Sequence, residues 1–217
     1  MSRPTSAVAI CNLALDLLKE RPISNIEDPE TVPEAICARW YDVDRAALLQ
    51  AYNWGFATKS RALPLGDTPD VAIYTDAYVF PNDYLHLKAI KSPRLALNHF
   101  DYSIEGNQLL INNSGASSLD VWYIFDEETV TKFSPLFIEL FVAELALRLS
   151  FKITVAPEIV RAVKVLADSL RLRALAKNGQ ADPPTKYESS RIVNAGLFPA
   201  SVQQVAGDYS FDDYEID

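Results

Sequence analysis

The residues of this chain that could carry chemistry are its two histidines, two cysteines and many carboxylates. His86 and His99 are the only histidines, and neither has a partner at the spacing of a metal site. The sequence contains no G-x-S-x-G nucleophile motif, no P-loop and no G-x-G-x-x-G dinucleotide motif. We therefore expect no catalytic residues, no cofactor-binding residues and no metal ligands.

The 29 aspartates and glutamates leave one enzymatic alternative open. Two carboxylates that face each other can act as general acid and general base in glycoside hydrolysis. The sequence does not bring any two of them together, and solvation accounts for acidic residues on helix faces and in loops. A polysaccharide hydrolase stays an alternative, and the leading expectation is a protein that is not an enzyme.

The net charge and the two cysteines further restrict the kind of protein that this chain can be. The formal net charge of −9 argues against a grip on DNA or RNA, which requires a basic surface. Cys11 and Cys37 lie in separate helical patterns and are expected to be small buried hydrophobes without a disulfide. The N-terminal segment carries Asp16 and Glu20 and lacks a signal-peptide pattern, so we expect the protein to stay in the cytoplasm where it is made.

The apolar stretch 134–154 is the element around which the others must be arranged. Ser134 is a good N-cap, and Pro135 fits the first helical position. Apolar residues then occur nearly all round the helix, which predicts a central bundle helix with one side available to a neighbouring subunit. Its recurring charges argue against a membrane span. Two of them, Glu144 and Arg148, are expected to pair along the helix.

Three further helices are expected around this one. The first is capped by Thr5 or Ser6 and runs to about residue 20. The last begins at Pro157, packs antiparallel to the central helix, and ends at the stop signal Asn178-Gly179. Its stripe is apolar, and its arginines and lysines are expected to face outward.

The second helix is expected over residues 34–52. Its apolar residues recur at helical spacing and predict a buried stripe. That stripe is Ile36, Trp40, Val43, Ala47 and Leu48. Asp42, Asp44 and Arg45 are expected on the opposite, exposed face. Trp54 and Phe56 are expected to be core anchors where the helix stops.

Residues 57–132 have a different pattern, with recurring prolines and no helical repeat. Segments 78–80, 85–90 and 119–125 predict strands. Gly106-Asn107 predicts a tight hairpin between 102–104 and 108–111. The fold class is therefore α+β, mainly α, an antiparallel helix bundle with an inserted small β-rich unit and an extended C-terminal arm. The expected domains are 1–56 and 133–178 for the bundle, 57–132 for the β-rich unit, and 179–217 for the arm.

The arm combines a proline-containing departure with an acidic, aromatic end. The final DYSFDDYEID holds five acids and no base. Two interpretations stay open, a disordered solvated tail and an arm that orders against a partner through apolar anchors. The candidate anchors are Tyr187, Ile192, Val193, Leu197, Phe198, Tyr209, Phe211 and Tyr214.

Several segments, taken in order, resemble one family. Five segments resemble head-to-tail connector proteins of short-tailed bacteriophages, the tail tubular protein A type. They are AICNLALDLL, AICARWYDVDRAALLQAYNWGFAT with Arg61 beyond it, YVFPNDYLHLKAI, YSIEGNQLLI and FSPLFIELFVAELALRLSFKIT. The third segment resembles the family's Tyr-x-x-Pro-x-Asp-aromatic-aliphatic motif at Tyr78, Pro81, Asp83, Tyr84 and Leu85. The resemblance covers about residues 7–178.

The resemblance implies a virion structural protein of the phage neck. It implies a ring-forming adaptor, a dodecamer, between the portal protein and the tail nozzle protein. Such a ring forms part of the DNA exit channel, helps retain packaged DNA and lets DNA pass without specific binding during ejection. It also implies that the C-terminal arm binds the portal, and that no membrane is involved. Some members have been credited with glycan degradation, which keeps the hydrolase alternative, and a cytoplasmic helical regulator that binds a partner peptide is a third hypothesis.

Overall fold

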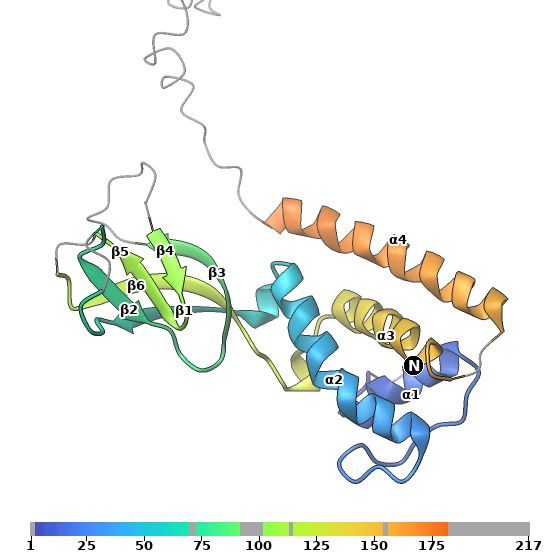
Figure 1. Ribbon diagram of the computed structural model, residues 1–217. Coiled ribbons are helices and arrows are strands. Elements are labelled where there is room, and N and C mark those ends of the chain that lie inside the picture. The colour runs from blue at the N-terminus through green and yellow to red at the C-terminus, as the bar shows by residue number, and fades with distance from the viewer. Residues whose placement is uncertain (1–2, 70–72, 92–101, 113–114, 154–155, 182–217) are drawn as a thin grey trace, which may run out of the picture. The chain divides into compact units, whose positions relative to one another are not determined.

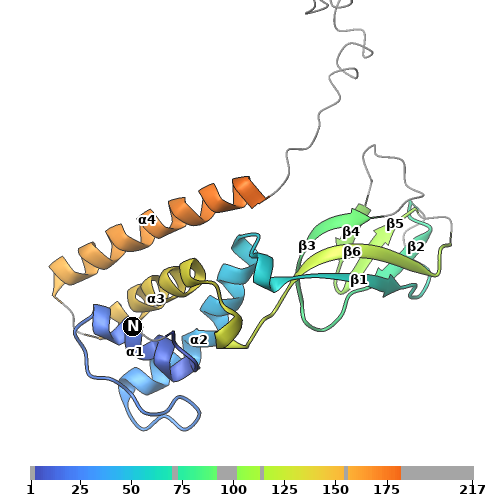
Figure 2. The ribbon, with the colours of Figure 1, turned by 180° about the vertical axis from the view of Figure 1, so that it is seen from behind.

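The computed structural model describes residues 3–69, 73–91, 102–112, 115–153 and 156–181, which all belong to one compact unit, residues 1–181. These residues form an α+β structure with four α-helices and two three-stranded antiparallel sheets. All six strands lie in the chain between the second and third helices. Figure 1 shows the elements in chain order, and Figure 2 shows them from behind.

The first two helices begin at good N-caps. Helix α1 (Ala7–Leu17) starts after Ser6, whose side chain accepts a hydrogen bond from the backbone N–H of Ala9. Helix α2 (Val32–Ala51) starts two residues earlier than predicted, because Thr31 and Glu34 form a capping box. Both start sites follow from short polar side chains that satisfy otherwise unpaired backbone N–H groups.

The prediction of the buried face of α2 was wrong in part: Ile36 and Leu48 are buried and Asp42 is exposed, as expected, but the face is rotated from the predicted one. Asp44 and Arg45, expected to be exposed, are buried, and Val43 is exposed. The buried side is made by Ile36, Cys37, Tyr41, Asp44, Arg45, Leu48 and Leu49. The face is rotated because Asp44 and Arg45 have ion-pair partners on other segments, and paired charges can be buried.

Helix α3 (Pro135–Ser150) is the central helix, as predicted. Ser134 caps it and Pro135 opens it. In both views α3 lies between α4 (Pro157–Ala181) on one side and α1 and α2 on the other (Figures 1 and 2). The nine buried residues of α3 pack in both directions, so an all-round apolar sequence is what this position requires.

Helix α4 packs antiparallel to α3, as expected, but it does not stop at Asn178-Gly179. The helix continues to Ala181. A glycine costs about 1 kcal/mol relative to alanine inside a helix, which a long helix can absorb. The predicted end of this helix, at Asn178, is therefore three residues too early.

Trp54 and Phe56 are core anchors at the end of α2, as predicted. The Trp54 indole N–H donates to the Leu48 carbonyl at 2.9 Å. Its ring meets Phe137 edge-on at a centroid distance of 5.1 Å, and Phe56 meets the same ring at 5.2 Å. Cys11 and Cys37 are also fully buried in this core as free thiols, as expected.

The strands form two sheets. One has the order β1-β6-β3, from β1 (Thr58–Pro64), β6 (Ser118–Phe125) and β3 (Tyr84–Lys91). The other has the order β2-β5-β4, from β2 (Asp76–Val79), β5 (Gln108–Ile111) and β4 (Tyr102–Glu105). The sequence analysis missed β1, because TKSRALP buries only Leu63 among its seven residues.

The predicted hairpin is confirmed. Glu105 pairs with Gln108 across the turn, and Gly106 has φ +56°. That backbone conformation favours glycine, since a Cβ would be strained there. Side chains from both sheets form a core distinct from the helical one, so the sheets pack against each other.

Candidate interaction surface

Helix α4 has two apolar faces. Its inner face is buried and consists of Val163, Ala167, Leu170 and Ala174. On the other side Val165 is 70% exposed, Leu172 is 68% exposed and Leu175 is 56% exposed. Their spacing of seven and three residues places them along one side of the helix. A helix that packs once in a monomer needs only one apolar face.

Exposed bases border this outer side. They are Arg161, Lys164, Arg173 and Lys177, and in the described part of the chain no ion pair involves any of them. We call these four bases together with Val165, Leu172 and Leu175 the α4 basic face. It combines spare positive charge with uncovered apolar area, which is the composition of a docking surface.

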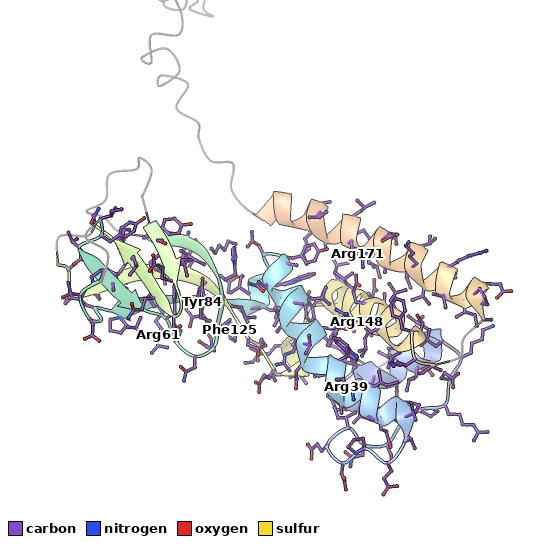
Figure 3. The ribbon with its side chains drawn as sticks, viewed as in Figure 1. Arg39, Arg61, Tyr84, Phe125, Arg148 and Arg171 are labelled. Atoms are coloured by element: carbon purple, nitrogen blue, oxygen red, sulfur yellow. The ribbon has the colours of Figure 1, made fainter. Side chains whose placement is uncertain are left out.

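Arg171 fixes α4 onto α3. Its guanidinium donates to both carboxylate oxygens of Glu144, at 2.6 and 2.7 Å, and to Asp168 at 2.7 Å. The hydrogen bonds with Glu144 raise the pKa of Arg171. A bidentate pair of this kind also sets the orientation of the two helices. Figure 3 labels Arg171 on α4 and Arg148 on α3.

The predicted pair between Glu144 and Arg148 is absent, because each has a partner on another helix. Arg148 Nε donates to Asp44 Oδ1 at 2.9 Å, and its guanidinium lies 4.5 Å from the centre of the Trp40 ring. Burial raises the pKa of Asp44, and the charge of Arg148 partly opposes this shift. Pairs between helices replace pairs along one helix, since they also gain from packing.

Asp44, Glu144, Arg148 and Arg171 line a pocket of about 580 Å³ between α2, α3 and α4. The other lining residues are mostly apolar, and Phe151 on the rim is exposed. Both carboxylates of this pocket are engaged by arginines. The arrangement holds three helices together.

A second pocket, of about 600 Å³, lies where the start of α1, residues 26–27 and residues 128–130 meet α2, and we call it the acidic pocket. Its charged lining residues are Glu27, Asp42, Arg45 and Glu128. Arg45 is only 5% exposed. Its Nε and Nη2 donate to the two carboxylate oxygens of Asp126 at 3.1 and 3.0 Å, and its Nη1 donates to Asp42 at 2.5 Å. Glu128 lies 3.9 Å away.

Tyr41 also lines the acidic pocket. Its side chain is 4% exposed, and its hydroxyl has no hydrogen-bond partner among the described residues. Burial raises the pKa of Tyr41, and the positive charge of Arg45 partly opposes this shift. Burial acts to lower the pKa of Arg45, but the hydrogen bond with Asp126 and the negative charges of Asp126, Asp42 and Glu128 together outweigh it, and the pKa is raised. The guanidinium therefore stays charged.

The segment with Tyr78, Pro81, Asp83, Tyr84 and Leu85 lies in the β-rich part. Asp83 accepts from Lys59 Nζ at 2.8 Å and from the Tyr123 hydroxyl at 3.2 Å. Tyr84 stacks on Phe80 with ring centres 3.8 Å apart. Figure 3 labels Tyr84 and Phe125 here. Each of these contacts joins a turn to a strand, so the motif has a structural role in this fold.

The candidate anchors of the arm, Tyr187 to Tyr214, lie outside the described residues, as does His99. Among the residues that the structure does describe, no three histidines, cysteines or carboxylates gather as a metal site requires. No helix within the described ranges is long and apolar enough to cross a membrane.

Sequence reasoning missed both the acidic pocket and the outer face of α4. The acidic pocket brings together side chains from four separated segments, which no local pattern reveals. The outer face had a signal, because Val165, Leu172 and Leu175 are apolar at helical spacing beside the predicted stripe. No family model and no curated protein matches this chain.

Proposed function

We propose that this chain is a ring-forming head-to-tail adaptor of a short-tailed phage. In this proposal a dodecameric ring of the chain lies between the portal protein and the tail nozzle protein, surrounds the DNA exit channel and helps retain packaged DNA. The chain is then a virion protein of the tail neck, made in the host cytoplasm, with no catalytic role.

The observation that carries the proposal is the uncovered outer side of α4. The outer side of a surface helix in a monomer is normally polar. Here Val165, Leu172 and Leu175 are exposed together on a helix that already packs on α3. Contiguous exposed apolar residues mark interaction sites, and lateral contacts between ring copies would cover them.

The distribution of charge supports a DNA channel without DNA binding. Helix α4 carries five bases and two acids, a net +3, so the rest of the chain carries −9 − 3 = −12. A strongly acidic lumen repels the phosphate backbone, and DNA can slide through without sticking. The bases of α4 would then face neighbouring protein.

Electron microscopy of the purified chain mixed with its cognate portal protein tests the proposal. We expect one added ring on the portal at roughly micromolar concentration, a level at which modest specific interfaces bind. A variant with Val165→Ser and Leu172→Ser should add incomplete rings or none. Tyr102→Ser with Ile104→Ser, which alters exposed apolar residues of β4, is the matched control. No association of the wild-type chain with the portal would refute the adaptor function.

Deletion of residues 180–217 tests the proposed portal-binding arm. We expect the helical circular dichroism to be retained and the attachment to the portal to weaken. A truncated protein that does not fold would mean that this segment belongs to the core. In the same preparations we expect no release of reducing sugar from host capsule.

A further inference from the structure

The acidic pocket has an excess of negative charge. Arg45 faces three carboxylates, those of Asp42, Asp126 and Glu128, and Glu27 adds a fourth at the pocket lining. One guanidinium neutralises one of these charges. The remaining carboxylates favour a second cation. The side chains of Asp42 and Glu128 are mostly exposed, so a cationic group of another molecule can reach them directly.

A guanidinium suits a site that is lined by several carboxylates. It carries five N–H donors in a flat fork, so it can serve more than one carboxylate at once. The pocket is therefore suited to an arginine side chain.

The α4 basic face supplies such side chains. Arg161 and Arg173 are exposed, have no ion pair in the described structure, and border the uncovered Val165 and Leu172. In both views α3 lies between α4 and the α1–α2 side of the bundle, where the acidic pocket lies (Figures 1 and 2). The two surfaces of one copy therefore face away from each other.

We propose that the α4 basic face of one copy docks on the acidic pocket of a second copy, with an arginine of α4 entering the pocket. Because the two contacting surfaces differ, the contact is head-to-tail, and repeating it closes a ring when the rotation per copy permits. The inference rests on the proposed ring function and names the surfaces through which the ring would close.

Charge-swapped variants of the full chain test this contact. The first variant carries Arg161→Glu, Lys164→Glu and Arg173→Glu, which leaves three acids and one base on the α4 face, so both of its surfaces are acidic. The second carries Glu27→Lys and Glu128→Lys, so both are basic, while Asp42 and Asp126 remain to hold Arg45. Sedimentation equilibrium at up to about 100 μM detects contacts with dissociation constants in that range.

We expect the wild-type chain to self-associate and each variant alone to associate at least about tenfold more weakly, a loss of roughly 1.4 kcal/mol. An equimolar mixture of the two variants should recover association, because acidic and basic surfaces then alternate. Arg61→Glu and Glu105→Lys, exposed positions outside both surfaces, serve as controls and should associate as the wild type does.

Three outcomes would overturn the contact: a wild-type chain that stays monomeric, variants that associate normally, or a mixture that does not recover. The proposed function fails separately, if the wild-type chain adds no ring to the portal. Rings on the portal together with an unrecovered mixture would keep the function and discard this contact.

Discussion

The helical part and the β-rich part of this protein place their charges differently. The helical part buries Glu34, Asp44 and Arg45, each with partners on another segment or at a helix cap. In the β-rich part, Asp76 is buried and accepts hydrogen bonds from the Thr75 hydroxyl and the Gly115 backbone N–H, whereas the ion pair of Lys59 with Asp83 lies nearer the surface. The comparison shows that the bundle joins its elements through arginine–carboxylate ion pairs with a buried partner, whereas the buried carboxylate of the sheets is held by uncharged hydrogen-bond donors.

The largest expected effect on stability comes from removing an aromatic side chain from the helical core. Phe137 is fully buried and contacts the rings of Trp54, Phe56, Phe133 and Phe141. Phe137→Ala should lower the free energy of unfolding by about 4 kcal/mol, since it leaves a cavity among rigid rings. Urea unfolding followed by circular dichroism measures this.

Leu109→Ala, in the core of the sheets, is the comparison variant. Leu109 is also fully buried, and its replacement by alanine should lower the free energy of unfolding by about 3 kcal/mol. A larger loss from Leu109→Ala than from Phe137→Ala would contradict the view that the aromatic helical core dominates stability.

The next largest effect on stability separates a buried ion pair from a surface one. Arg45→Met removes a buried partner from Asp126 and should cost about 3 kcal/mol, because the carboxylates around it lose their compensating charge. Lys59→Met removes the surface pair with Asp83 and should cost about 1 kcal/mol or less. Urea midpoints at low and high salt separate the two. Equal losses of unfolding free energy would show that the pair of the buried Arg45 stabilises the fold no more than the surface pair of Lys59.

The smallest effect is the pH dependence that arises from Glu34. Hydrogen bonds from Thr31 lower the pKa of Glu34 from 4.5 to about 2. A lowered folded-state pKa stabilises the fold above pH 4.5, and this contribution is lost as the pH falls from 4.5 toward 2. Glu34→Gln should therefore reduce the fall in melting temperature across that range. Glu30→Gln, in the preceding loop, is the control, and an unchanged pH profile in Glu34→Gln would argue against the capping role.

The sequence was sufficient for features that depend on neighbours in the chain. Ser134 with Pro135 predicted the start of α3, and Gly106 predicted the hairpin, because caps and turns are local. It was insufficient where the partner is distant. Asp44 and Arg45 were assigned to the exposed face, since only the fold brings Arg148 and Asp126 to them.

The candidate surfaces were harder to predict for the same reason. The acidic pocket depends on Glu27, Tyr41 and Glu128 meeting in space. The exposure of Val165 and Leu172 depends on which side of α4 packs on α3, and two apolar stripes lie close together in the sequence. A stripe of seven-residue period beside the main one is the signal that could have been used.

The pairing of Thr58 with Ile124 has a consequence for engineering and evolution. This antiparallel pair lies close to where the chain leaves α2 and where it approaches α3, so the entrance and exit of the β-rich segment are neighbours. Directly opposed residues in antiparallel strands have Cα atoms only about 5 Å apart. A segment with adjacent ends can be exchanged for a short linker or for a foreign domain without pulling the flanking helices apart. We therefore expect this position to tolerate modular replacement, so that lineages sharing the same helices can carry unrelated inserts there.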